Sequence, residues 1–191
     1  MFVVSGCNGS GKTTASYMVL PKELGCRRYV NSDEFAKSLS PFAPHAASIT
    51  ASRYMLEEIN YLLEKREDFG VETTLSTKSL QKIISRAKAA GYHTTVLYVW
   101  LNSPELAIKR VEKRVRDGGH YIAPETVVRR YYTGLQYFFR YYIPIADKWI
   151  LVDNTEGDYK NVAQGWKGSM IVHDNKKFEA IRKMAMETTE Q

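Results

Sequence analysis

Short apolar runs alternate along the chain with longer segments in which apolar residues recur at helical spacing. The runs predict buried strands, and the helical spacing predicts amphipathic helices. Strands are expected at residues 2–5, 28–31, 69–74, 94–101 and 148–153. Helices are expected at residues 12–23, from 33 to before Pro41, and at 46–66, 77–90, 103–118, 124–142 and 175–188. A hairpin is expected at residues 162–163 and 170–172, before the last helix.

Strands that alternate with helices predict an α/β fold with a mainly parallel, five-stranded sheet, followed by the C-terminal hairpin and helix at about residues 160–190. The chain has 191 residues and no repeat or linker, so a single domain over residues 1–191 is expected. Residues 94–101 are apolar on both faces, which predicts a central strand. Ligands of such folds bind at the carboxyl ends of the strands, so functional residues are expected just after strands.

The first predicted strand leads into Gly6-Cys7-Asn8-Gly9-Ser10-Gly11-Lys12-Thr13, which matches the phosphate-loop pattern Gly-x-x-x-x-Gly-Lys-Ser/Thr at every fixed position. Backbone N–H groups of such a loop surround a polyphosphate, aided by the positive end of the following helix. We expect Lys12 to reach the terminal phosphates as a catalytic residue and the Thr13 hydroxyl to bind Mg²⁺. The alternative is a glycine-rich turn without a ligand. The expected nucleotide-binding residues are Gly6, Asn8, Gly9, Ser10, Gly11, Lys12, Thr13 and Thr14.

Asp33 follows the second predicted strand, so the topology directs its carboxylate toward the sheet edge that carries the phosphate loop. A hydroxyl that attacks a phosphate needs a nearby carboxylate to take its proton. Asp33 is therefore the candidate general base and a candidate acceptor-binding residue. In the alternative interpretation it caps the helix that starts here, because Ser32, Asp33 and Glu34 all suit a helix N-terminus.

Glu72 lies at the exit of the third predicted strand and is followed by hydroxyl-bearing residues, including Thr73 and Thr74. A carboxylate can hold sugar hydroxyls, and threonines can bind phosphate oxygens. Glu72, Thr73 and Thr74 are therefore candidate substrate-binding residues. In the alternative interpretation, the hydroxyls of Thr73, Thr74 and Ser76 cap the helix expected from Thr77.

Basic residues concentrate between residues 109 and 130, in a chain whose formal net charge is +6. This density indicates an anionic partner, either the phosphate held by the phosphate loop or a nucleic acid, and we favour the first. Gly118-Gly119 can act as a hinge, so residues 109–131 are expected to form a lid. A solvated basic helix face is the alternative, and only two of the four arginines are expected to be functional. The candidate lid residues are Arg114, Arg116, Arg129, Arg130 and His120.

Composition excludes several classes of protein. Apolar residues make up 44% and charged residues 25% of the chain, which is typical of a folded globular protein rather than a disordered one. The longest apolar run, Val96 to Leu101, is too short to span a membrane, and the N-terminus does not resemble a signal peptide, so we expect a cytoplasmic location. Cys7 and Cys26 are expected to be free thiols. One helical stripe is expected to be core rather than a base-stacking platform: Tyr131, Leu135, Phe138, Phe139 and Tyr142.

The phosphate loop is followed in order by Asn31-Ser32-Asp33, by Glu72-Thr73-Thr74-Leu75-Ser76, and by a segment from Arg114 to Pro124 that contains Gly-Gly-His. With these motifs the chain resembles the zeta-toxin family of P-loop kinases, most closely the short zeta-like branch, over residues 1 to about 155. The resemblance implies a P-loop three-layer sandwich with a kinase-type sheet, and Mg-ATP as phosphate donor. It also implies that Asp33 is the base toward a sugar hydroxyl of a UDP-N-acetyl amino sugar. Glu72 would hold that acceptor, and the lid arginines would contact the transferring phosphate.

Two residues depart from the family pattern. Ser32 stands where members often carry Pro, and His120 stands where a second lid arginine is expected. We therefore expect an ATP-dependent kinase with a small hydroxyl-bearing acceptor, for which a nucleotide sugar is the best candidate. The alternative is a nucleotide-dependent switch or weak NTPase that acts through a protein or nucleic-acid partner. An antitoxin protein is a candidate partner, whereas nucleic acid and membrane are not expected.

Overall fold

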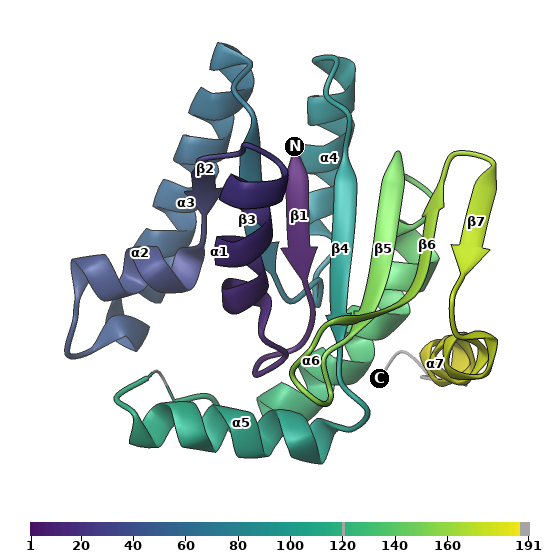
Figure 1. Ribbon diagram of the computed structural model, residues 1–191. Helices are drawn as coiled ribbons and strands as arrows, with labels where there is room; N and C mark the ends of the chain where they lie inside the picture. Colours follow the sequence, from purple (N-terminus) through teal and green to yellow (C-terminus); the bar gives the residue numbers. More distant parts are fainter. Residues whose placement is uncertain (120, 188–191) are drawn as a thin grey trace.

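The computed structural model describes residues 1–119 and 121–187. The strands are β1 (Phe2–Ser5), β2 (Arg28–Val30), β3 (Phe69–Thr73), β4 (Thr95–Trp100), β5 (Lys148–Asp153), β6 (Lys160–Trp166) and β7 (Ser169–Val172). They form a sheet in the order β2-β3-β1-β4-β5-β6-β7 (Figure 1). Strands β1 to β5 run parallel, whereas β6 and β7 are antiparallel. The α/β class predicted from the alternating pattern is confirmed.

The described helices also follow the predicted alternation. They are α1 (Lys12–Glu23), α2 (Ser32–Leu39), α3 (Ser48–Lys65), α4 (Ser79–Ala89), α5 (Pro104–Arg116), α6 (Pro124–Tyr137) and α7 (Asn175–Glu187). A 3₁₀ turn, η1 (Pro44–Ala47), precedes α3, and a π-helical turn, η2 (Phe138–Tyr142), continues α6. The predicted end of the last helix at residue 188 lies outside the described residues.

Three hydrophobic clusters of the described residues hold the helices in place, and one of them packs α5 and α6 against the end of the sheet. In Figure 1, α1 lies in front of the sheet, whereas α4 and α6 lie behind it. The larger core joins the sheet to helices α3, α4, α6 and α7. In the smallest cluster, Ala15 of α1 packs against Val4, Val99 and Val152. The predicted aromatic stripe of α6 and η2 is buried throughout, which confirms it as core.

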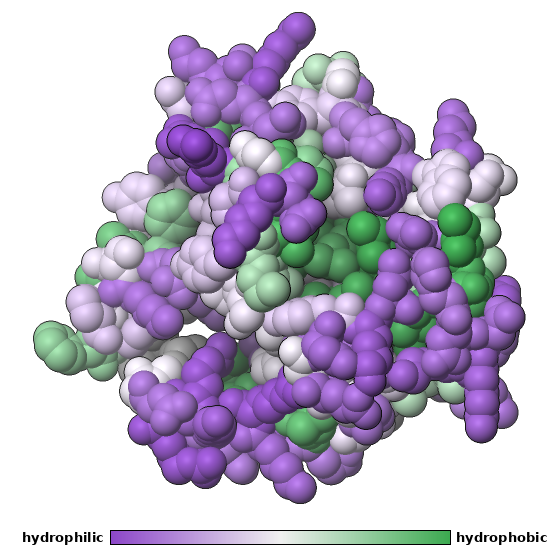
Figure 2. Space-filling model, in the orientation of Figure 1, coloured by the Kyte–Doolittle hydropathy of each residue, from purple (hydrophilic) through white to green (hydrophobic). Residues whose placement is uncertain are grey.

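Strand β4 is the middle strand of the sheet, and its Val96 and Val99 are fully buried, as the two-sided apolar pattern of residues 94–101 predicts. The C-terminal hairpin differs from the expectation, because β6 pairs with β5 and extends the same sheet to seven strands. The backbone of β5 pairs with β4 on one edge, and the hairpin occupies its other edge. Its outer surface is incompletely covered, and Figure 2 shows a hydrophobic area over this part of the sheet. Ile171 of β7, for example, is 44% exposed.

Two further predictions concern membrane helices and cysteines. Among residues 1–119 and 121–187, no helix combines the length and the apolar character that a bilayer crossing requires. Cys7 and Cys26 are both free, as predicted, and both are buried.

Candidate active site

A cleft of about 420 Å³ lies at the carboxyl ends of β1, β2 and β3, between α2 and the pair α5 and α6. It brings together most of the residues predicted from the sequence. Those that line it are Asn8, Gly9, Gly11, Lys12, Thr13, Thr14, Asp33, Glu72, Thr73, Thr74, Arg114 and Arg130. The cleft is also lined by residues that were not predicted as site residues: Asn31, Ser32, Met55, Thr77, Ser79 and Arg110.

The phosphate loop joins β1 to α1 and depends on glycine at two crowded positions. Gly9 has φ +78°, and a Cβ atom there would lie 2.6 Å from the Ala107 carbonyl oxygen of α5. Gly11 has φ +93°, and its Cβ would lie 2.5 Å from Nδ2 of Asn154. L-residues rarely adopt this left-handed conformation, and the neighbouring atoms leave no space for a side chain. Gly6 and Ser10 are buried in the loop but do not line the cleft.

Lys12 is the first residue of α1, and only 7% of it is exposed. Its ammonium donates to the carbonyl oxygen of Cys7 at 2.8 Å. An ammonium carries three donors, so Lys12 keeps donor capacity for phosphate oxygens in the adjacent cleft. Burial raises the pKa of the Cys7 thiol to about 11, and the nearby charge of Lys12 only partly opposes this. Cys7 therefore contributes its carbonyl rather than a thiolate.

Residues between β5 and β6 support the phosphate loop, and the sequence analysis missed them. The Asn154 side-chain amide donates to the Ser10 carbonyl, and the Tyr159 hydroxyl donates to the Gly11 carbonyl, both at 2.8 Å. Arg110 of α5 donates to the carbonyl of Asn154 at 2.9 Å. Asn154 directly follows β5. Because sites of this fold form at the carboxyl ends of strands, this position was the signal that could have identified Asn154 from the sequence.

Asp33 lies on the first turn of α2, with its side chain exposed at the cleft. It is not the helix cap, because Asn31 takes that position and accepts from the Asp33 N–H at 2.9 Å. The capping interpretation of Asp33 is therefore wrong. Burial lowers the pKa of Arg130, and the like charge of Arg129 adds to this, whereas the charge of Asp33 opposes it. Asp33 and Arg130 thus attract each other across the cleft.

Glu72 faces two hydroxyl groups at the end of β3. The Thr13 hydroxyl donates to its Oε1 at 3.1 Å, and the Tyr29 hydroxyl donates to its Oε2. Asn31 in turn donates to the Tyr29 oxygen at 3.0 Å. Burial, together with the carboxylate of Glu72, raises the pKa of Tyr29 above its ordinary value, so the phenol remains a donor.

Thr73 and Thr74 also line the cleft. The Thr73 hydroxyl accepts from the Leu75 N–H at 3.1 Å, and the Thr74 hydroxyl bonds to that of Ser76 at 2.8 Å. The helix that these hydroxyls were alternatively expected to cap begins later, at Ser79, and its N-cap residue Lys78 makes no side-chain cap bond. The capping interpretation is therefore wrong for Thr73, Thr74 and Ser76.

The predicted lid arginines divide into two groups. Arg114 and Arg130 line the cleft, and Arg130 donates to the Asn8 side-chain oxygen at 3.1 Å. Arg116 and Arg129 are exposed and do not line it, so their catalytic role stays a prediction that requires the lid to move. His120 lies outside the described residues. The two glycines follow the end of α5, and the N–H groups of Gly118 and Gly119 donate to the carbonyls of Val115 and Arg114.

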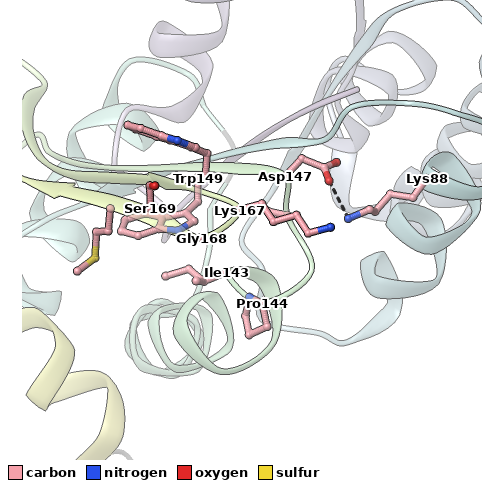
Figure 3. A pocket seen from close by; sticks show the side chains of 11 residues that line it. Lys88, Ile143, Pro144, Asp147, Trp149, Lys167, Gly168 and Ser169 are labelled. Atoms are coloured by element: carbon pink, nitrogen blue, oxygen red, sulfur yellow. Dashed lines mark ion pairs between the residues drawn. The ribbon is translucent and has the colours of Figure 1, made fainter.

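A second cavity, of about 550 Å³, lies at the amino end of β5 and carries no predicted site residue (Figure 3). Its charged lining includes Lys88 and Asp147, which form an ion pair at 2.9 Å. Asp147 also accepts from the N–H and hydroxyl of Thr94, both at 2.9 Å. This carboxylate therefore ties α4 to the starts of β4 and β5, which indicates a structural role.

We expect Asp147 to make folding sensitive to acid. Partial burial opposes its ionisation, but hydrogen bonds from Lys88 and Thr94 outweigh this and lower the pKa of Asp147 from 3.8 to about 2. Because this folded pKa lies below the unfolded value, the carboxylate stabilises the fold above about pH 4 and loses this effect as the pH falls toward 2. Urea unfolding should show a lower unfolding free energy for Asp147→Asn near neutral pH and a smaller loss on acidification. If the unfolding free energy changes with pH equally in Asp147→Asn and in wild type, this prediction is wrong. Asp158→Asn, at an exposed carboxylate, is the control.

Two sequence comparisons found similar proteins. The model of the family described as zeta toxin matches residues 1–142. An uncharacterized protein of Haemophilus influenzae is 31% identical over 126 residues, which cover 66% of this chain and 88% of that protein.

Solved structures show the same fold at low identity. A chain of the AvrRxo1-ORF1:AvrRxo1-ORF2 complex with sulphate ions is similar with a TM-score of 0.75 at 17% identity over 99% of this chain. This chain spans only 65% of the length of that protein. A chain of the PezAT chromosomal toxin-antitoxin system of Streptococcus pneumoniae has a TM-score of 0.63 at 15% identity, with 98% of this chain and 88% of that chain covered. A putative kinase from Chloroflexus aurantiacus has a TM-score of 0.60 at 13% identity over 96% of this chain and 97% of that chain.

Proposed function

Because the chain belongs to the zeta-toxin family, we propose that it is a Mg-ATP-dependent kinase that phosphorylates a hydroxyl of a small acceptor. One observation carries the proposal: the phosphate loop, the carboxylate of Asp33 and the guanidinium groups of Arg114 and Arg130 line a single cleft. Phosphoryl transfer needs a grip on the donor, a base for the attacking hydroxyl and cations for the developing negative charge. The cleft contains candidates for all three.

In the donor half, the phosphate loop binds the polyphosphate of ATP, and Lys12 donates to its terminal oxygens. The hydroxyl of Thr13 is an oxygen ligand that suits Mg²⁺, and the bound ion would neutralise charge on the phosphates. Among the described residues, no group of three or more His, Cys, Asp and Glu side chains can hold a metal ion. In this proposal Thr13 and the phosphates of the nucleotide supply ligands to the ion, and waters complete its octahedral shell.

In the acceptor half, Asp33 takes the proton of the attacking hydroxyl while Arg114 and Arg130 stabilise the transferring group. Thr73 and Thr74 are candidate acceptor contacts, as is Glu72. An adjoining pocket of about 370 Å³ is strongly basic, because Lys37, Arg110, Lys113 and Arg114 line it with one carboxylate, that of Asp117. This charge favours an anionic acceptor, such as a UDP-N-acetyl amino sugar.

An acceptor panel tests the proposal. Purified protein with Mg-ATP should release ADP only when the hydroxyl-bearing acceptor is present, and a nucleotide sugar should serve better than the free sugar because of the basic pocket. The measurement is ADP release with mass spectrometry of the acceptor, across sugars, nucleosides and nucleotide sugars. Slow ATP hydrolysis that no acceptor changes would contradict the kinase and favour a nucleotide-dependent switch.

An antitoxin is the partner that we propose. The support is the PezAT neighbour, which comes from a toxin-antitoxin system. Expression of the chain alone and with its genetic neighbour, followed by size-exclusion chromatography, tests for a stable complex. Elution at the monomer position in both cases would contradict the proposal.

A further inference from the structure

Tyr29 lies at the centre of a hydrogen-bond network that the sequence did not indicate. It belongs to the short strand β2, where it pairs with Gly70 of β3. Its hydroxyl donates to the Glu72 carboxylate and accepts from the Asn31 side-chain amide at 3.0 Å. The phenol is half-buried, and its ring lies 5.7 Å from that of Tyr17. The Tyr29 hydroxyl is therefore held between two polar partners.

The other oxygen of Glu72 faces the phosphate loop. The Thr13 hydroxyl donates to Oε1 of Glu72 at 3.1 Å. A hydroxyl has one hydrogen and two lone pairs, and it binds a cation only through its oxygen. A carboxylate that accepts the hydrogen therefore leaves the lone pairs of Thr13 available for a metal ion. A group that is hydrogen-bonded to a metal ligand orients that ligand and tunes the affinity of the site for the metal.

We propose that Tyr29 is a positioning residue for the metal-nucleotide half of the site. It fixes the Glu72 carboxylate so that this group accepts the Thr13 hydrogen and turns the Thr13 oxygen toward a divalent cation. In this inference Glu72 serves Thr13, and this role replaces the acceptor contact that the proposed function gives it as a candidate. The inference rests on the proposed function in one respect, because it requires that the site binds Mg-ATP. It does not depend on the identity of the acceptor.

Asn31 connects this network to the candidate base. Its side-chain oxygen accepts from the Asp33 N–H at 2.9 Å, and its amide nitrogen donates to Tyr29. One side chain therefore holds both the start of α2, which carries Asp33, and the phenol that holds Glu72. The orientation of the metal ligand and the position of the base are linked through Asn31.

Substitution of Tyr29 tests the inference without any acceptor. Tyr29→Phe keeps the ring and removes the hydroxyl. ATP binding is measured by calorimetry over a series of Mg²⁺ concentrations and in EDTA. We expect the Mg²⁺ concentration for half-maximal enhancement of ATP binding to rise about tenfold. This is the low end of the about 10–100-fold that loss of a partner directly behind a metal ligand costs, because Tyr29 acts one step further back, through Glu72. ATP affinity in EDTA should be unchanged.

Three further variants separate positioning from folding. Tyr17→Phe, at the neighbouring ring, is the matched control and should behave as wild type. Glu72→Gln should raise the Mg²⁺ requirement as Tyr29→Phe does, and the double variant should be no worse than Glu72→Gln alone, because Tyr29 acts through Glu72. Thermal melting should show all four variants folded.

The results distinguish the inference from the proposed function. An unchanged Mg²⁺ requirement in Tyr29→Phe overturns the inference. If Tyr29→Phe and Glu72→Gln instead raise only the KM for the acceptor, the inference is also overturned, and Glu72 is assigned to the acceptor. If the Mg²⁺ requirement rises while wild type phosphorylates no acceptor, the inference stands and the kinase proposal fails. If wild type binds no Mg-ATP, both are overturned.

Discussion

Lys12→Ala is expected to abolish most ATP binding. The Lys12 ammonium is buried beside the phosphate loop. Among the described residues, its hydrogen-bond partner is the Cys7 carbonyl, at 2.8 Å. Truncation of one partner of a buried, hydrogen-bonded charge pair costs about 2–5 kcal/mol, which corresponds to roughly 30-fold to several thousand-fold weaker binding. Calorimetric titration with Mg-ATP measures the loss, and phosphoryl transfer should fall with it.

The matched control for this prediction lies on the same helix. Lys22 is in the last turn of α1 and is exposed, so Lys22→Ala should bind Mg-ATP as wild type does. Equal melting temperatures of the two variants would exclude unfolding as the cause. ATP binding by Lys12→Ala within about threefold of wild type, less than about 1 kcal/mol, would contradict the role of Lys12.

Asp33→Asn is expected to remove catalysis while ATP binding is retained. The two side chains have the same size, but the amide cannot take the proton of an attacking hydroxyl. General base catalysis typically contributes about 10²–10⁴-fold, so kcat should fall by this factor. The Kd for Mg-ATP should change little, because Asp33 lies on α2 and not on the phosphate loop. Single-turnover transfer and a binding titration measure the two effects separately.

Glu34→Gln provides the control for Asp33. Glu34 is the next residue in the first turn of α2, and it pairs with Lys37 at 3.3 Å on the surface without lining the cleft. Both substitutions remove one negative charge near the same helix N-terminus, so any shared effect reflects the helix. Wild-type transfer by Asp33→Asn would falsify its role as base.

The sequence predicted much of the fold because its signals are local. Each strand and helix carries its own apolar pattern, and Gly25, Gly91 and the prolines mark several element ends. The membership of the hairpin in the main sheet was not predictable in this way. It depends on the pairing of β6 with β5, which no pattern within residues 160–172 specifies.

The candidate site was predicted unevenly for the same reason. Asp33 was found because it follows β2, and Glu72 because it lies near the carboxyl end of β3, and such positions meet at one edge of a parallel sheet. Tyr29 was missed because it lies within a strand, where an aromatic residue normally indicates packing. Among the arginines, helical spacing did not distinguish Arg114 and Arg130, which line the cleft, from the exposed Arg116 and Arg129.

The sequence by itself determined the phosphate loop, the α/β alternation and the family, since these depend on contiguous motifs. Only the tertiary structure decided which side chains hold the loop and its hydroxyl in place. Thr13 and Glu72 lie 59 positions apart, and Asn154 lies 144 positions from Ser10. Such contacts arise when distant strands meet at one edge of the sheet, so their partners depend on packing of the whole core and not on any local pattern.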